Sequence, residues 1–386
     1  MNATEILQEL LSPAGRADPF PLYAAVHRLG PVLPVTDDVF LVAGYAATDE
    51  VLRSLVFEIP SEPSDQPALQ MMQRSILRAN PPDHGRMRSL IAQVFTPRRV
   101  ATLRPAVEAA VDGLLDDLLD DLLDDLQAEV DFMDRFAFRL PVTVICELLG
   151  VPPDDRHRFR PLASDLTAAL ELTDASDASA DAAARELGEY FAGRLRDPGA
   201  DGLVSALVAA RDAGDGRLSD EELLANLILL LVAGFETTTD LLGNGLAILL
   251  REPGLVPDEA FVEEVLRYDS PVQVTTRTAR NDAEISGTAI PAGAGLVLLL
   301  GAANRDPRRF PQPDRFEPSR TGNKPLSFGA GAHICLGNSL ARLEATIAFS
   351  RLRERFAGIT PAGEPARRDR LVLRGYQSLP VRLVRA

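Results

Sequence analysis

The stretch that decides the fold is Phe328-Gly329-Ala330-Gly331-Ala332-His333-Ile334-Cys335-Leu336-Gly337, which holds one of only two cysteines in 386 residues. A zinc or iron–sulfur site needs several thiolates, so a single cysteine cannot build one. A single cysteine can be the axial ligand of a haem iron. That role requires a thiolate, although free cysteine has a pKa of about 8.5. The stretch therefore predicts a haem whose iron is bound by Cys335.

The residues around Cys335 fit this role. We expect a helix over residues 332–356, so that Cys335 lies where the helix begins and meets the partial positive charge of its amino end. Glycines let the backbone lie flat against a planar ligand and let the helix approach it, and an aromatic ring can shield the sulfur. These residues are Phe328, Gly329, Gly331 and Gly337. The competing interpretation is a glycine-rich turn with an incidental cysteine, and ten ordered positions favour the haem site over it.

A second polar pattern interrupts a long apolar helix, which we expect over residues 219–250 with a capping box at its start. Glu236 and Thr237 stand among aliphatic residues, where they cost helix propensity and burial free energy. An acid beside an alcohol is a proton relay, and a threonine can hydrogen-bond its own backbone and locally open the helix. Small Ala233 and Gly234 leave room on one face. The alternative is a kinked core helix with a solvated glutamate.

Both patterns resemble motifs of the cytochrome P450 family. The decapeptide is similar to the family's cysteine-ligand signature, F-G-x-G-x-H-x-C-x-G, with every fixed position matched, and residues 233–238 resemble the oxygen-binding motif A-G-x-[D/E]-T. The resemblance runs from about residue 18 to the C-terminus. It implies that Cys335 binds the iron of haem b, that Ala233 and Gly234 adjoin the haem, and that Glu236 and Thr237 have the acid and alcohol roles.

A further pair resembles the family's E-x-x-R motif. Glu264 and Arg267 stand at i,i+3 on a helix expected over residues 258–268. The resemblance gives them Arg315 as a downstream partner, and buried arginine–carboxylate pairs persist only when they are fully hydrogen-bonded. We expect these three residues to be structural rather than catalytic.

Haem carries two propionates, which cations must meet. His84 and Arg88 stand at i,i+4 near a helix start, Arg277 is on an expected strand, and His333 precedes the cysteine by two residues. Each alone is typical of an ordinary surface residue. The resemblance implies that these four residues grip the propionates.

Helical patterns dominate the rest of the chain, and short strands and turns follow from residue 271 to about 325. We expect a hairpin of strands at 32–35 and 39–42, and strands near 371–373 and 379–383. Further helices are expected over residues 18–29, 45–55, 71–77, 83–95, 98–127, 136–149, 154–172 and 177–195. The fold class is thus mainly α with a smaller β region, in one catalytic domain over residues 1–386. The resemblance implies the P450 fold, a triangular prism with the haem between the long helix and the cysteine loop.

Three local features have simpler explanations than a ligand site. The Leu-Leu-Asp-Asp repeat over residues 114–125 favours a solvated helix face over a metal cluster, because the acidic pairs rotate with the helix and no histidine joins them. Cys146 lies in an apolar run typical of a core. Residues 251–257 leave room for a turn only, where the family has a further helix.

Composition excludes several classes. A net charge of −16 argues against nucleic acid, whose affinity rests on cations that neutralise phosphates. We find no uncharged apolar run of about 18 residues and therefore expect no membrane span. The first residues lack the basic start of a signal peptide. Two cysteines in a long chain fit a reducing compartment, so we expect the cytoplasm.

The resemblance implies a soluble haem-thiolate monooxygenase that hydroxylates or epoxidises a medium-sized, mainly apolar organic substrate with oxygen from O2. We expect bacterial secondary-metabolite biosynthesis of a polyketide, peptide or aromatic compound, acting on a small molecule that is free or bound to a carrier protein. Ferredoxin and ferredoxin reductase would donate electrons, with a basic patch at Arg98, Arg99, Arg104 and Arg342. Two alternatives stay open: oxidative coupling or ring formation without net oxygen insertion, and a haem-binding non-oxygenase, against which Glu236 and Thr237 argue.

Overall fold

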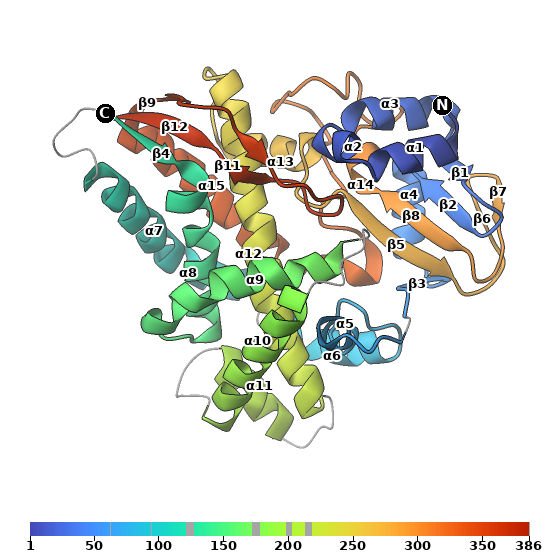
Figure 1. The fold of residues 1–386 in the computed structure, drawn as a ribbon, viewed down its shortest axis with the longest axis horizontal. Coiled ribbons are helices and arrows are strands. Elements are labelled where there is room, and N and C mark those ends of the chain that lie inside the picture. Colours follow the sequence, from blue (N-terminus) through green and yellow to red (C-terminus); the bar gives the residue numbers. More distant parts are fainter. Residues whose placement is uncertain are drawn as a thin grey trace. The chain divides into compact units, whose positions relative to one another are not determined.

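The computed structural model describes residues 1–61, 63–93, 95–120, 127–171, 178–197, 203–212 and 218–385. They form two compact units between which the chain passes several times (Figure 1). Unit 1 consists of Met1–Pro60, Gly243–Cys335 and Pro365–Gln377, and unit 2 of Ser61–Leu242, Leu336–Glu364 and Ser378–Ala386. The single catalytic domain over residues 1–386 stays a prediction.

Unit 1 is built on a five-stranded sheet in the order β1-β2-β8-β5-β3. Only the β2–β8 pair is parallel. The predicted hairpin of β1 and β2 is confirmed, with Val32 opposite Val42. The strands are β1 (Val32–Pro34), β2 (Val39–Val42), β3 (Phe57–Glu58), β5 (Val274–Ala279) and β8 (Gly295–Leu299).

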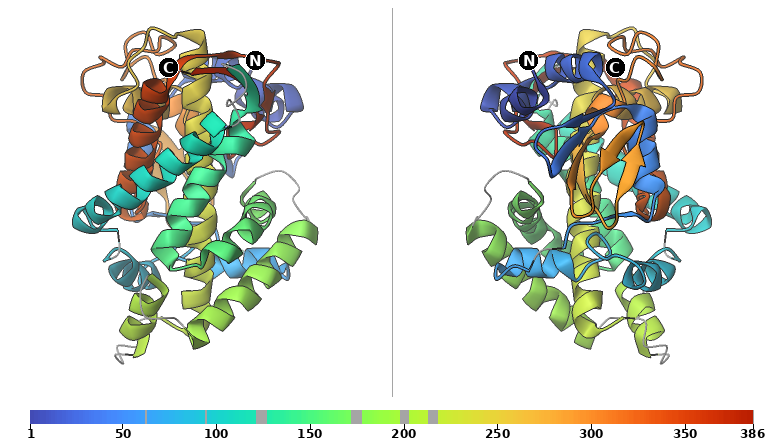
Figure 2. Two further views of the ribbon diagram at one scale, coloured as in Figure 1. Left: turned by 90° about the vertical axis from the view of Figure 1, so that its left-hand side faces the viewer. Right: turned by 90° about the vertical axis from the view of Figure 1, so that its right-hand side faces the viewer.

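The alternation of side chains along β2 divides the core of unit 1 into two layers. Phe40 and Val42 pack with α4 (Tyr45–Arg53), whereas Leu41 packs with α1 (Ala3–Leu10) and α3 (Phe20–Leu29) on the other face. The blue helices beside the sheet in the right-hand view of Figure 2 show this arrangement. The rest of unit 1 contains α2 (Pro13–Ala17), α13 (Glu259–Tyr268), β6 (Ala283–Ile285), β7 (Thr288–Ile290), α14 (Leu300–Ala303), the 3-10 turn η4 (Gly331–His333) and β10 (Ala366–Arg367).

Unit 2 is mainly helical. Its long helix, α12 (Asp220–Arg251), begins with the predicted capping box, in which Ser219 N donates to Glu222 and Glu222 N donates to Ser219 Oγ at 3.2 Å. A three-stranded sheet in the order β4-β12-β9 closes the unit. The other elements are α5 (Pro67–Gln73), α6 (Asp83–Ile91), α7 (Pro97–Asp120), β4 (Gln127–Asp131), η1 (Met133–Ala137), α8 (Arg139–Leu149), η2 (Pro153–Arg158), α9 (Phe159–Thr167), η3 (Ala168–Leu170), α10 (Ala178–Arg196), α11 (Leu203–Asp212), α15 (Asn338–Arg355), β9 (Phe356–Pro361) and β12 (Pro380–Arg385), with β11 (Tyr376–Ser378) at the junction of the units.

Several predicted boundaries were wrong. Gln127, the expected end of the long helix, is instead in β4, because it pairs with Val384 in the sheet, and residues 121–126 fall outside the described residues. The helix expected over 71–77 starts instead at Pro67, a residue that suits the first helical position. The helix expected from residue 332 begins at Asn338, since a 3-10 turn and a glycine cap intervene. Helix α11 was not predicted.

The acidic repeat of α7 lies on a solvated face where the structure describes it. Asp116, Asp117 and Asp120 are exposed while Leu115 and Leu118 are buried. Asp121, Asp124 and Asp125 fall outside the described residues. Within the described part of the chain, no group of three or more His, Cys, Asp and Glu side chains could hold a metal ion. Cys146 is buried, as predicted, and burial raises the pKa of its thiol to about 12.

Helix α12 bears on the expectation of no membrane span. By length and composition it could cross a membrane, but 67% of its most apolar stretch is buried inside the protein. A core helix passes the same test, and the burial of α12 is typical of one.

Glu344 on α15 gives the fold a test of its pH dependence. Its carboxyl is buried, and its Oε2 atom has no hydrogen-bond partner among the described residues. Burial raises its pKa from 4.5 to about 8, so its contribution to stability is full below its unfolded pKa and is lost as pH rises through about 8. We expect Glu344→Gln to flatten the fall in melting temperature between about pH 6 and pH 9, measured by circular dichroism.

The control is Glu354→Gln, which changes an exposed glutamate of the same helix. It should leave the pH dependence of wild type unchanged. An unchanged slope in Glu344→Gln would show that the Glu344 carboxyl does not titrate in this range.

Candidate functional site

The cysteine loop of unit 1 is closed by its own backbone. Cys335 N donates to Phe328 O at 2.9 Å, and Gly329 N donates to Leu326 O at 2.8 Å. Phe328 is partly buried, whereas Cys335 is exposed. The loop therefore holds a thiol at the surface of unit 1 on a hydrogen-bonded turn.

Two glycines make this turn possible. Gly329 and Gly331 have φ values of +69° and +66°, in the left-handed region that favours glycine. A Cβ atom at Gly331 would lie 2.4 Å from Leu52 O, so the turn also approaches the end of α4 more closely than any side chain permits. The close approach that Gly331 allows is thus to α4, and the prediction that these glycines let the backbone lie flat against a planar ligand stays a prediction.

The expected position of Cys335 at the first residue of a helix was wrong. Gly337 is the N-cap of α15, and the helix begins at Asn338, three residues after the cysteine. The turn η4, which contains His333, precedes the cysteine instead. The loop backbone, rather than a helical first turn, therefore sets the position of the sulfur.

The acid–alcohol segment lies in the part of α12 that belongs to unit 2. Thr237 Oγ1 donates to Ala233 O at 2.8 Å, which confirms the expected bond of this threonine to its own helix. Glu236 is 0% exposed, so the alternative of a solvated glutamate is wrong. Ala233 is exposed, and a Cβ atom at Gly234 would lie 3.2 Å from Ile145 Cδ1. Gly234 thus lets α8 pack closely against α12.

The four residues predicted to meet the propionates divide between the units. His84 and Arg88 share one face of α6 in unit 2, where burial, and then the nearby Arg88 guanidinium, lower the pKa of His84. Arg277 and His333 belong to unit 1. Arg277 is buried on β5 and donates to Thr276 O at 2.7 Å and to Thr275 Oγ1 at 3.3 Å.

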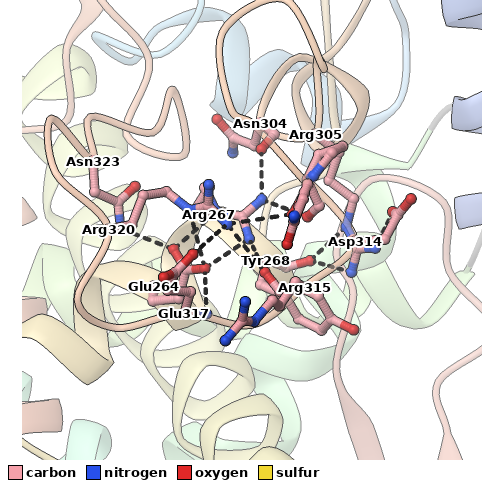
Figure 3. Close-up of polar contacts among 12 residues, drawn as sticks. Glu264, Arg267, Tyr268, Asn304, Arg305, Asp314, Arg315, Glu317, Arg320 and Asn323 are labelled. Carbon is pink, nitrogen blue, oxygen red and sulfur yellow. Dashed lines mark hydrogen bonds and ion pairs between the residues drawn. The ribbon is translucent and has the colours of Figure 1, made fainter.

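Glu264 and Arg267 form a bidentate ion pair on α13 with both side chains 0% exposed. Arg267 Nε and Nη2 donate to the two carboxylate oxygens at 2.8 and 2.7 Å. The remaining hydrogens of Arg267 reach carbonyl oxygens at 2.8 to 3.1 Å, as Figure 3 shows, and these belong to Asn304, Pro313 and Arg315. The pair is thus fully hydrogen-bonded, which a buried pair requires.

The partner expected downstream, Arg315, takes part through its carbonyl oxygen, and its side chain is exposed. The guanidinium that reaches Glu264 is that of Arg320, at 3.4 Å from Oε1. Glu317 N and Asn323 Nδ2 also donate to the Glu264 carboxylate. The sequence analysis missed Arg320, because it lies in an irregular segment whose partners no periodicity reveals.

This network yields a test that separates two neighbouring arginines. Arg320→Ala should lower the free energy of unfolding by about 2 to 4 kcal/mol, because it leaves a buried carboxylate short of a donor. Arg315→Ala keeps the backbone carbonyl and should cost less than about 0.5 kcal/mol. Urea unfolding followed by circular dichroism measures both. Equal effects of the two substitutions would contradict this assignment.

The residues present fit a haem. The loop offers one exposed thiol, which is the donor set of a single axial ligand, and buried or partly buried cations stand on both units. Burial and the nearby Arg88 lower the pKa of His84, and a negative group beside the two side chains would oppose that effect.

Comparison with known proteins agrees with this chemistry. A family model described as cytochrome P450 matches residues 259–378. The chain is 37% identical to 6-deoxyerythronolide B hydroxylase of Saccharopolyspora erythraea, over 97% of this chain and 98% of that protein. It is 40% identical to the cytochrome P450 monooxygenase PikC of Streptomyces venezuelae, over 95% and 91% of the two chains. The crystal structure of CYP164A2 from Mycobacterium smegmatis in its ligand-free state is similar, with a TM-score of 0.88 and 38% identity over 98% of this chain and 100% of that one.

Proposed function

The chain belongs to the cytochrome P450 family, and we propose that it hydroxylates a medium-sized, mainly apolar organic substrate in bacterial secondary metabolism. It has the fold of that family and is an oxidoreductase that incorporates oxygen from O2. The cofactor of the family is a haem held by a cysteine thiolate. We assign haem b to this chain and Cys335 as its ligand.

The observation that carries the proposal is the exposed thiol of Cys335 on its hydrogen-bonded glycine turn. When bound, the haem supplies the activation of O2, and a thiolate ligand favours cleavage of the O–O bond. The chain must keep the sulfur deprotonated and in place. The bond from Cys335 N to Phe328 O and the left-handed glycines fix the turn that would hold the sulfur in place.

Glu236 and Thr237 have the task of moving protons. The Thr237 hydroxyl gives its hydrogen to Ala233 O, so its oxygen lone pairs stay available to accept a hydrogen bond from another donor. Glu236 is buried in the same helical turn and is the nearest acid along the chain. In this assignment Glu236 supplies the proton and Thr237 Oγ1 orients it.

The cations hold the haem carboxylates. His84 and Arg88 would meet them from α6, and Arg277 and His333 from unit 1. Ala233, Gly234, Phe328, Gly329 and Gly337 would adjoin the ring. Glu264 and Arg267 have a structural task, as does the Arg315 carbonyl.

Electrons would come from a ferredoxin and its reductase in the cytoplasm. Arg98, Arg99 and Arg104 are exposed on α7, and Arg342 is on α15 within the same unit. A ferredoxin with an acidic surface suits such a patch despite the negative net charge of the chain. The substrate would reach the enzyme free or on a carrier protein.

Thiolate ligation is tested by the carbon monoxide difference spectrum of the reduced protein. We expect a Soret band at about 450 nm in wild type and its loss in Cys335→Ser, whereas Cys146→Ser, the matched change at a buried cysteine, keeps it. Wild-type protein that is folded but shows only a band at about 420 nm would refute thiolate ligation.

The relay is tested by electron coupling. Thr237→Ala should raise the amount of hydrogen peroxide released per O2 consumed several-fold, because the variant no longer orients the proton that Glu236 supplies. Thr239→Ala is the control, since Thr239 Oγ1 donates to Ala137 O at 3.1 Å and its loss affects packing. Thr239→Ala should lower the melting temperature and keep the coupling. Unchanged peroxide release in Thr237→Ala would remove Thr237 from the relay.

A further inference from the structure

Arg78 stands out among the arginines of unit 2. It is partly buried in the turn between α5 and α6, and its guanidinium makes no hydrogen bond or ion pair with any residue that the structure describes. Its neighbour Arg86 is paired with Glu222 at 2.6 Å. Burial lowers the pKa of Arg78, and no carboxylate among the described residues opposes that effect.

The turn that carries Arg78 is fixed in place. Ile76 N donates to Asn226 Oδ1 of α12 at 2.9 Å, and Asn226 itself is fully buried. On the other side, Ala68 N of α5 donates to Asp181 of α10 at 3.0 Å. Figures 1 and 2 show α5 and α6 beside the first half of α12. The backbone on both sides of this segment is therefore hydrogen-bonded to α10 and α12, and Arg78 lies in a turn that is fixed at Ile76.

Asn226, which anchors the Arg78 turn, lies on the same helix as the acid–alcohol segment. Asn226 precedes Ala233 by seven residues and Thr237 by eleven, so the three share one face of a helix with 3.6 residues per turn. Seven residues correspond to about 10 Å along the axis. The anchor of the Arg78 turn thus lies on the face that presents Thr237, about 10 Å before Ala233 and about 16 Å before Thr237 along the helix.

A partly buried guanidinium without a partner among the described residues has lost part of its hydration, and an anion that meets it would offset that cost. Its planar fork matches carboxylate and phosphate oxygens. We propose that Arg78 binds an anionic group of the substrate, a carboxylate or a phosphate, at a turn whose anchor lies about 10 to 16 Å along α12 from Ala233 and Thr237. This inference rests on the proposed function and narrows it: the substrate has an apolar body and one acidic end, and Arg78 determines specificity for that end.

The test uses probes that differ only in the end group. Decanoate, decyl phosphate and 1-decanol share one alkyl chain, whose extended length is close to the expected spacing. Their binding to the haem-loaded protein is measured by titration calorimetry. We expect wild type to bind at least one of the two anions roughly ten-fold or more tightly than the alcohol, as a charge-assisted pair implies. The preferred anion identifies the end group as carboxylate or phosphate.

Three variants locate the effect. Arg78→Gln should bind all three probes alike, and Arg78→Lys should keep most of the preference because it keeps the charge. Arg74→Gln is the control, since Arg74 is an exposed arginine of the same segment. It should behave as wild type. Each variant is first shown to have the melting temperature and haem content of wild type.

Wild type that binds neither anion more tightly than the alcohol overturns the proposal, including wild type that binds none of the probes. So does a preference that survives in Arg78→Gln. Loss of haem from Arg78→Gln alone would assign Arg78 to the haem carboxylates and would likewise overturn it. Calorimetry reports on Arg78 whether or not the reduced protein gives a thiolate spectrum, so failure of the proposed function is recognised separately.

Discussion

The buried ion pair of Glu264 and Arg267 is the constraint on which the cysteine loop depends. Taking two charges out of water costs several kcal/mol per ion, and only complete hydrogen bonding offsets that cost. The Arg267 guanidinium obtains it by binding carbonyl oxygens far along the chain, and the Glu264 carboxylate by binding the backbone and side chains of residues 317–323. A pair at i,i+3 on one helix thus immobilises a long irregular segment.

From this pair, hydrogen bonds continue to the sulfur-bearing turn. Arg267 donates to Asn304 O, and the Asn304 side chain binds Leu326 N at 2.6 Å and Ser327 Oγ at 2.9 Å. Ser327 Oγ in turn donates to Leu266 O at 2.6 Å, back on α13. The turn from Leu326 to Gly329 and the bond from Cys335 N to Phe328 O follow directly. The Glu264–Arg267 pair is therefore connected by hydrogen bonds to the turn that carries Cys335, the proposed haem ligand.

The sequence predicted this site unevenly, for physical reasons. The turn that carries Cys335 could be predicted because a positive φ value and a close approach require glycine, and Gly329 and Gly331 meet that requirement. Glu264 and Arg267 were found because helical spacing brings them together. Arg320 was not, because in irregular backbone the distance between two residues depends on every intervening dihedral angle. The helix predicted from residue 332 was wrong because Ile334 has extended backbone, with ψ of 135°, and Cys335 N donates to Phe328 O rather than to a carbonyl four residues back.

The net charge of a sequence does not predict whether an individual charged side chain has a partner in the folded protein. A net charge of −16 describes the solvated surface and argues against polyanionic partners. The net charge does not describe a cation that is partly buried and has lost part of its hydration. The interaction of a charge with its surroundings depends on local burial and on the nearest opposite charge, which outweigh distant, screened charges. Arg86 and Arg78 are eight residues apart and have the same formal charge. Arg86 forms an ion pair with Glu222, whereas Arg78 meets no acid among the described residues. In an acidic protein, a partly buried arginine that meets no acid among the described residues is therefore the stronger indication of an anionic ligand, because carboxylates that could have neutralised it are abundant in the sequence.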